Sequence, residues 1–180
     1  EPDKEVYKEG DKVTLTATSG DEKYIFSGWS GDINSKENPL TITVEGNMSL
    51  TANILEKFSV VADSVTDSYT QTETEFEMTV DTFNPSDIEV EMNASCDTVD
   101  ESNFSFNENE GEYTFSWTPA AEEAGEHTIS FTVTDGITSS EPVSAKITVA
   151  DEIVKNGQSI QTAIDGSNSG DRIIVEQGTY

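Results

Sequence analysis

The chain has 180 residues, 33% of them apolar and 25% charged, and its 36 acidic side chains outnumber the nine basic ones to give a net charge of -27. This length has room for one large or two small domains, and so negative a charge repels nucleic-acid phosphates and anionic membranes. Nucleic-acid binding and direct membrane insertion are therefore excluded as functions. Cations are the favoured partners, either as a screening layer around a hydrated surface or as Ca²⁺ at defined sites.

Cys96 is the only cysteine, so no disulfide forms within the chain, and we expect it to be a core or loop residue. The sequence lacks an apolar run of the roughly 18 residues that a membrane helix needs. It starts at Glu1 without a basic and then apolar signal segment, so we interpret the chain as mature or excised. These features favour an extracellular or cell-surface protein of a bacterium or archaeon.

The predicted elements begin with strands in residues 1–56. Apolar and polar residues alternate over residues 13–17, 40–44 and 50–54, with glycine-rich turns between the runs. Between the first two runs stands the string F-S-G-W-S-G-D at residues 26–32. Its tryptophan, Trp29, is either a sugar-stacking platform or a core residue. Gly28 and Gly31 favour the core, because they allow a large ring to fold over a small core at tight turns.

With this string, residues 5–55 resemble the divergent internalin-type B-repeat, a small β-rich module of bacterial and archaeal surface proteins. The resemblance implies a spacer or adhesive stalk and brings no catalytic residues with it.

Residues 57–150 also read as short strands. Six runs alternate apolar and polar residues, and Asp, Asn, Gly or Pro bound them: 58–62, 76–80, 88–92, 113–117, 129–133 and 143–149. This pattern predicts a Greek-key β-sandwich. Residues 113–119, 124–136 and 143–149 resemble the bacterial putative-immunoglobulin and cadherin-like family. The first half of this region, residues 58–105, matches the family only in its number of strands. Its strand order is therefore what the resemblance implies.

Asp135-Gly136 is typical of a tight hairpin turn. The cadherin-like resemblance adds a second interpretation, in which an Asp at such a strand end binds Ca²⁺. The candidate calcium ligands are Asp63, Asp67, Asp97, Asp100 and Asp135. Calcium takes about six to eight oxygen ligands, here from several loops, and no D-x-D-x-D-G loop occurs. Both the turn and the calcium interpretation stay open.

No catalytic residues are predicted. His127, the sole histidine, has no Cys, Ser or second His beside it, and we expect it at an exposed strand position. Among 36 carboxylates no acid–base pair stands out. The N-x-[ST] sequons at Asn47, Asn93 and Asn103 are either glycan sites on turns or ordinary loop asparagines.

Residues 151–180 read as linker, short strand, helix and strand. Ile160, Ala163 and Ile164 form an apolar helical stripe, Gly170-Asp171 makes a turn, and residues 173–175 form the second strand. The segment resembles the N-terminal cap of pectate-lyase-like right-handed parallel β-helices. Each coil of such a helix exposes an apolar face that the next coil covers, so we expect the chain to be a fragment.

The predicted fold class is all-β, with a B-repeat-like module (1–56), an immunoglobulin-like sandwich (57–150) and the capping first coil of a β-helix (151–180). The predicted function is structural and interactive: part of a surface filament, sheath, surface layer or adhesin stalk that binds copies of itself, other surface proteins or polysaccharide. The alternative is an accessory, carbohydrate-binding or spacer region of a secreted β-helix lyase or hydrolase. That alternative requires exposed aromatic side chains, whereas Phe115, Trp117 and Phe131 follow the apolar alternation of buried positions.

Overall fold

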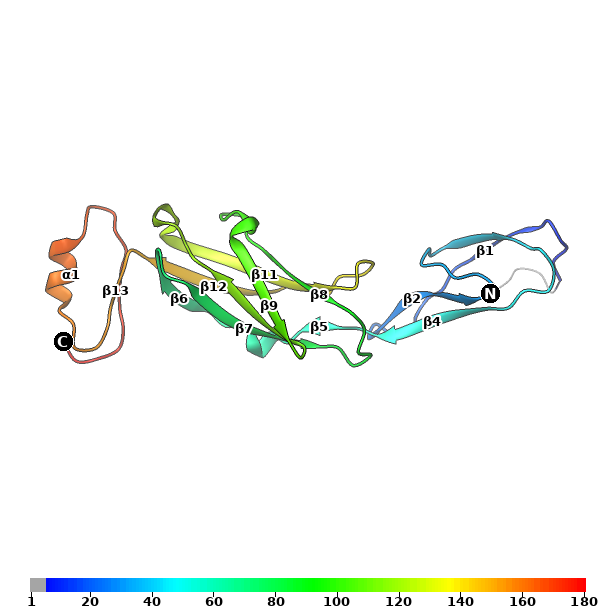
Figure 1. Ribbon diagram of the computed structural model, residues 1–180, viewed down its shortest axis with the longest axis horizontal. Coiled ribbons are helices and arrows are strands. Elements are labelled where there is room, and N and C mark those ends of the chain that lie inside the picture. The colour runs from blue at the N-terminus through cyan, green and yellow to red at the C-terminus, as the bar shows by residue number, and fades with distance from the viewer. Residues whose placement is uncertain (1–5) are drawn as a thin grey trace. The chain divides into compact units, whose positions relative to one another are not determined.

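The structure is a computed structural model that describes residues 6–180; the first five residues of the predicted 1–56 module, Glu1 and Lys4 among them, lie outside the described residues. The chain divides into two compact units, Glu1–Lys57 with Asn84–Asp87, and Phe58–Phe83 with Ile88–Tyr180. Within residues 6–180 the regular structure is 14 strands, the helix α1 (Ile160–Gly166) and three single 3₁₀ turns (Figure 1). The fold class is therefore all-β, as predicted. The division into three modules stays a prediction.

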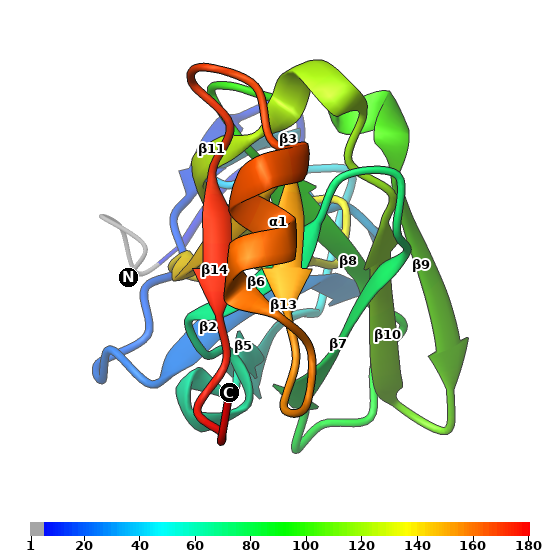
Figure 2. The same cartoon turned by 90° about the vertical axis from the view of Figure 1, so that its left-hand side faces the viewer.

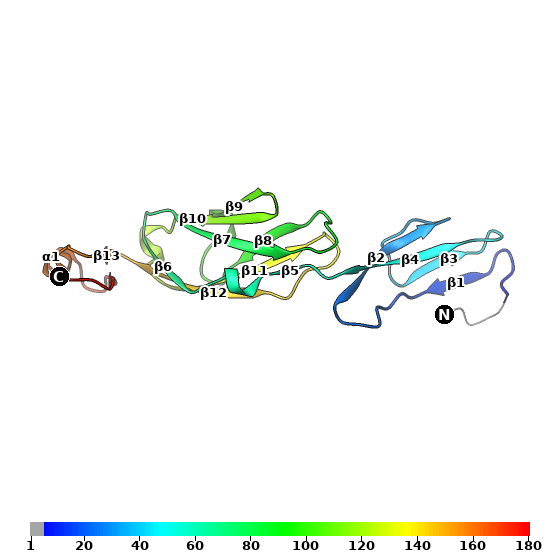
Figure 3. The ribbon, with the colours of Figure 1, turned by 90° about the horizontal axis from the view of Figure 1, so that it is seen from below.

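The first unit consists of two antiparallel strand pairs, β1 with β3 and β2 with β4 (Figure 3). Its strands are β1 (Lys12–Leu15), β2 (Tyr24–Gly31), β3 (Leu40–Thr43) and β4 (Leu50–Glu56). Both pairs contribute to one apolar cluster because alternate side chains of each strand point inward. Its buried members are Val13, Trp29, Leu40 and Ile42.

The second unit contains a sandwich of two four-stranded sheets, with the orders β5-β7-β10-β9 and β6-β12-β11-β8. The strands are β5 (Ser59–Val60), β6 (Ser68–Gln71), β7 (Phe76–Phe83), β8 (Glu91–Ser95), β9 (Phe104–Asn109), β10 (Glu112–Trp117), β11 (Gly125–Thr134) and β12 (Val143–Ala150). All the sandwich pairings are antiparallel except that of β6 with β12. When β5 and β6 are counted as two halves of strand 1, and β7 to β12 as strands 2 to 7, the two sheets have the strand orders 1-2-5-4 and 1-7-6-3. This is the strand order of an immunoglobulin-like sandwich.

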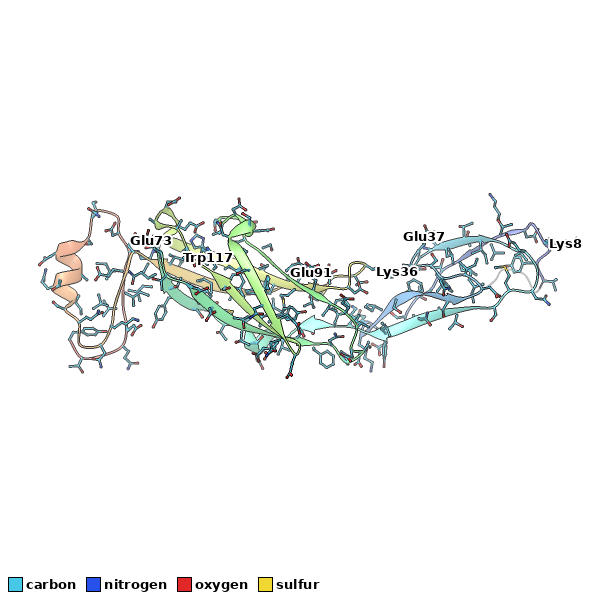
Figure 4. The ribbon with its side chains drawn as sticks, in the orientation of Figure 1. Lys8, Lys36, Glu37, Glu73, Glu91 and Trp117 are labelled. Carbon is cyan, nitrogen blue, oxygen red and sulfur yellow. The ribbon has the colours of Figure 1, made fainter. Side chains whose placement is uncertain are left out.

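The sandwich core lies between the two sheets, where the inward residues of each strand meet. Phe115 of β10 and Phe131 of β11 are fully buried, and their rings meet edge to face at 5.2 Å across the two sheets. Trp117 is 1% exposed and lies among the sandwich side chains (Figure 4). The prediction that these three aromatic residues are buried is confirmed.

Three strands differ from the predicted ones. β8 starts at Glu91 instead of Ile88, and the Val90 carbonyl accepts a hydrogen bond from the Tyr113 hydroxyl at 2.9 Å. β6 and β9 were not predicted. β6 has a polar residue, Thr70, at its buried position, so it lacks the apolar alternation on which the prediction depended. β9 alternates only at Phe104 and Phe106 and ends in Asn-Glu-Asn, so its apolar pattern is too short to stand out.

The chain ends in a strand–helix–strand segment, as predicted. β13 (Glu152–Val154) and β14 (Ile173–Val175) pair in parallel, and α1 lies in the connection between them (Figure 2). The Ser159 hydroxyl caps the helix by accepting a bond from the Thr162 amide at 3.2 Å. A β-helix needs several stacked coils, so one parallel pair leaves that assignment a prediction.

Candidate functional site

The F-S-G-W-S-G-D string forms part of the core of the first unit. Trp29 is 9% exposed, and its indole N–H donates to the Glu37 carbonyl at 2.9 Å (Figure 4 labels Glu37). The Phe26 ring packs against it at 5.4 Å. The prediction of a core tryptophan is therefore confirmed, and the ring has no free face for a sugar.

The glycines of the string have specific backbone roles. The register of β2 against β4 shifts between Phe26 and Gly28, and Gly28 has a φ of 146°. Gly31 has a φ of 115°, and a Cβ there would collide with the Ser49 carbonyl oxygen. Asp32 also holds Ser49, because the Asp32 carboxylate accepts a hydrogen bond from the Ser49 amide at 2.6 Å. The string thus attaches the end of β2 to the segment before β4.

Two of the candidate calcium ligands stabilise local turns. The Asp135 carboxylate accepts from the amides of Ile137 and Thr138 at 2.9 and 2.8 Å, and Gly136 has a φ of 81°. This confirms the predicted turn. Asp100 accepts from the Ser102 amide at 2.9 Å, and that hydrogen bond holds the pKa of Asp100 below its usual value.

The strand register keeps the candidate ligands apart. Asp135 follows Thr134, which pairs with Glu91 at the start of β8, whereas Asp97 and Asp100 come after the other end of that strand. The five residues of this strand, Glu91–Ser95, place its two ends roughly 13 Å apart. Asp67 instead accepts from the Lys146 amide of β12 at 2.8 Å, and Asp63 lies in the exposed 3₁₀ turn Ala62–Ser64. Within residues 6–180 no three His, Cys, Asp or Glu side chains form a metal-holding group. The structure does not bring the five together, and calcium binding at any of them stays a prediction.

His127 is buried, not exposed as predicted. It is 6% exposed, its Nε2 lies 2.7 Å from the Glu123 carbonyl, and its Nδ1 lies 2.7 Å from the Thr98 hydroxyl. A carbonyl only accepts, so Nε2 carries the proton and the Thr98 hydroxyl donates to Nδ1. The Cys96 thiol lies 3.3 Å from the Thr98 hydroxyl and is partly buried. The prediction failed because Thr98 lies 29 residues away, in a loop that the sequence did not place near β11, and because the Glu123 carbonyl just before β11 also contacts the ring.

The sequon asparagines are all exposed. Asn47 lies in the loop before β4 and Asn103 in a 3₁₀ turn, but Asn93 lies within strand β8 and not in a loop or turn as predicted. Asn103 also borders a pocket of about 250 Å³. Its other lining residues are Glu75, Ser105, Ser116, Trp117 and Thr118. The Ser105 and Ser116 hydroxyls bond each other at 2.9 Å, and the lining contains no histidine or cysteine to act as base or strong nucleophile.

Three residues that the sequence did not single out meet beside β13. The charge of the nearby Glu176 carboxylate, with partial desolvation and hydrogen bonding to that carboxylate, raises the pKa of Tyr69 of β6 above its usual value. The Tyr180 hydroxyl donates to the carbonyls of Glu176 and Val154. The one feature of the sequence that could have indicated this contact is the single tyrosine in the polar run S-Y-T-Q, and it does not indicate which residue Tyr69 contacts.

The part of the chain that the structure describes has no helix with the length and apolar character needed to span a membrane.

Comparison with known proteins gives one family match. Residues 2–57 match the family model described as the divergent InlB B-repeat domain. Among curated proteins, none matches this chain.

Several solved immunoglobulin-type structures are similar to about half of the chain. The titin M3 domain is 10% identical, with a TM-score of 0.39, and the match covers 52% of this chain and 98% of that one. The titin M7 domain is 14% identical with a TM-score of 0.38, covering 51% and 92%. The SrpA adhesin of Streptococcus sanguinis is 10% identical with a TM-score of 0.41, covering 51% of this chain and 56% of the adhesin chain.

Proposed function

We propose that this chain is a non-catalytic structural and interaction region of an extracellular prokaryotic surface protein. Its β units serve as spacers in a filament, sheath, surface layer or adhesin stalk, and they contact further copies or other surface proteins. The observation that carries the proposal is the use of the F-S-G-W-S-G-D string. Its Trp29, Gly31 and Asp32 are all committed to packing and backbone bonds, within the region that matches the B-repeat model.

The acidic surface gives cations a role in such an assembly. Neighbouring copies with a charge of -27 each repel one another unless cations screen them. The test is light scattering and electron microscopy of the same sample, with Ca²⁺ and with a chelator. Ordered filaments or lattices support the proposal, and a soluble monomer under every condition contradicts it.

The alternative is an accessory region of a polysaccharide lyase or hydrolase. One observation favours it, because Tyr69 and Tyr180 are 48% and 47% exposed and an exposed ring can stack on a pyranose. Anionic polysaccharides would be repelled, so the ligand would be neutral. Calorimetric titration with neutral polysaccharides tests this role: heat that a Tyr69→Ala variant loses supports it, and no heat in the unmodified chain contradicts it.

The finer features of the proposal are the β-helix, the glycans and calcium. Among the described strands, β14 pairs only with β13, so a second coil would add a parallel strand at the other edge of β14. Exposed Asn47, Asn93 and Asn103 would accept glycans, and mass spectrometry of the native protein tests each position.

A further inference from the structure

The outward face of the sheet β6-β12-β11-β8 is rich in short, uncharged side chains. Strand alternation places every second residue of these four strands on it, and we name these outward side chains the hydroxyl face (Figure 1 labels the strands). The register aligns Ser95, Ser130 and Ser144 in one row across the sheet, and Asn93 with Thr132 in the next. The Ser130 and Ser144 hydroxyls bond each other at 2.8 Å. These two rows carry no charge.

The charged side chains of the hydroxyl face lie outside these rows. Glu91 is at one corner, at the start of β8, and Glu126 near the start of β11 lies 3.4 Å from the Lys146 ammonium of β12. Asp67 borders the face and accepts a hydrogen bond from the Lys146 amide. Lys146 is the only Lys or Arg in residues 58–154. It offsets one of the two acids on the face, in a chain whose net charge is -27.

The outward face of the other sheet, β5-β7-β10-β9, is acidic. Asp81 of β7 lies directly opposite Glu112 of β10, and Glu77 lies opposite Ser116. The four strands of this sheet contain no Lys or Arg. Two such faces repel each other, whereas two hydroxyl faces can approach at little electrostatic cost. The hydroxyl face is therefore the better surface of the sandwich for contact between two copies.

We propose that the hydroxyl face binds the same face of a second copy of this chain about a twofold axis. In this arrangement each uncharged row meets uncharged rows of the partner, so neither copy presents its acidic sheet. Ser and Asn side chains form hydrogen bonds adaptably at binding surfaces, and Tyr69 of β6, 48% exposed, adds an aromatic ring. This interface rests on the proposed function and names the surface through which copies associate.

The size of the face predicts a weak association. Four strands at a spacing of about 4.8 Å, with β12 roughly 26 Å long, give about 500 Å² per copy. A pair of copies buries about 1,000 Å² in total, which is the lower limit for a specific interface. The carboxylates elsewhere on the two copies repel one another, so raising the NaCl concentration should strengthen the association by screening them.

The test is sedimentation equilibrium of the full chain, prepared without glycans, over a series of protein and NaCl concentrations. Ser130→Glu places a carboxylate at the centre of the hydroxyl face in both copies. Ser116→Glu is the matched control on the other sheet, because the Ser116 hydroxyl bonds that of Ser105 at 2.9 Å, as Ser130 bonds Ser144. Each variant thus gains one charge and loses one bond between serines.

We expect a monomer–dimer equilibrium in the unmodified chain. Ser130→Glu should raise the dissociation constant by about tenfold or more, because like charges then face each other, and Ser116→Glu should leave it unchanged. Equal dissociation constants in the two variants would overturn this interface but not the proposed function, since the copies would then associate through another surface. A monomer at every protein and NaCl concentration would overturn both.

Amide chemical shifts of the unmodified chain on dilution give a second measurement, which does not depend on the folding of a variant. Shifts that change with concentration in β11, β12 and β8 support the interface, and changes in β7 and β10 instead would overturn it. A glycan on Asn93 would cover the hydroxyl face. Its detection by mass spectrometry of the native protein would therefore also overturn the proposal.

Discussion

At the scale of single residues, many carboxylates of this acidic chain replace missing backbone acceptors. Asp32 accepts from Ser49, Asp67 from Lys146 and Asp135 from Ile137 and Thr138, all between 2.6 and 2.9 Å. Such charge-assisted bonds are stronger than neutral ones and hold a segment where no strand partner is available. Part of the acidity is therefore structural, and solubility accounts for only some of it.

Gly31→Ala should destabilise the first unit by about 2–3 kcal/mol. The added Cβ meets the Ser49 carbonyl at a positive φ of 115°, so steric collision adds to backbone strain. Gly46→Ala is the matched control, since Gly46 has a φ of 134° but nothing within 4 Å of the Cβ. Urea unfolding followed by resonances of the first unit measures both variants. Equal losses would mean that the collision is relieved by movement of the Ser49 segment.

The Tyr69 contact should weaken at alkaline pH. The Glu176 charge raises the pKa of Tyr69, and desolvation, the hydrogen bond to Glu176 and Tyr180 act in the same direction. A raised folded-state pKa means that the contact stabilises below the usual tyrosine value of about 10 and is lost as the pH rises through the folded value. NMR titration of the tyrosine rings checks this.

In that titration Glu176→Gln should lower the Tyr69 midpoint. Tyr113 serves as the internal control, because burial, Glu108 and Glu91 raise its pKa and Glu176 does not contribute. An unchanged Tyr69 midpoint in the variant would contradict the contact.

At the scale of elements, the connections depend on side-chain acceptors as much as on the strands. The turn between β11 and β12 should lose about 1 kcal/mol in Asp135→Ala, because two backbone amides lose their acceptor. Asp135→Asn should retain most of the stability, since its side-chain oxygen can accept the same bonds. Urea unfolding of the unmodified chain and both variants, once with a chelator and once with Ca²⁺, measures these losses of stability. A loss seen only with Ca²⁺ would favour a metal ligand over a turn residue.

The start of β11 depends on its buried histidine. His127→Leu should lower the free energy of unfolding by about 1–3 kcal/mol, because the Glu123 carbonyl and the Thr98 hydroxyl lose their partner. Thr128→Val tests the neighbouring exposed position of the same strand and should change stability little. Urea denaturation curves of the two variants give the comparison, and equal losses would show that the His127 bonds contribute nothing specific.

The predictability of these elements follows from their local patterns. The strands around Val13, Phe115 and Ile147 alternate apolar and polar residues, so the sequence predicted them, and Asp135-Gly136 predicted its turn. β6 eluded prediction because a strand whose buried residue is threonine looks like a loop. The exposed position predicted for His127 was wrong because Thr98, one of its two partners, lies 29 residues away in the sequence.

At the scale of the whole molecule, charge dominates the response to solvent. Described residues include only two ion pairs, Lys23–Asp21 and Lys146–Glu126, both exposed, so most carboxylates are balanced by solvent cations. The net charge of -27 therefore opposes the folded state through self-repulsion.

Raising NaCl from about 10 mM to about 500 mM should increase the Tm by several degrees, because the screening length falls from roughly 30 Å to a few Å. Thermal unfolding by circular dichroism measures the change. CaCl₂ at equal ionic strength is the control: the same increase indicates screening alone, a larger one indicates bound calcium, and a Tm that does not rise with salt contradicts the self-repulsion.

The sequence by itself determined the all-β class, most strands, the burial of Trp29 and the turn at Asp135-Gly136. These depend on side-chain alternation and turn chemistry, which act over a few neighbouring residues. Only the tertiary structure decided the strand order, the parallel pairing of β6 with β12, the burial of His127 and the Tyr69–Glu176 contact. Asp67 and Lys146 lie 79 residues apart. A bond of this kind exists only after folding has brought two strands together, and no local pattern records it.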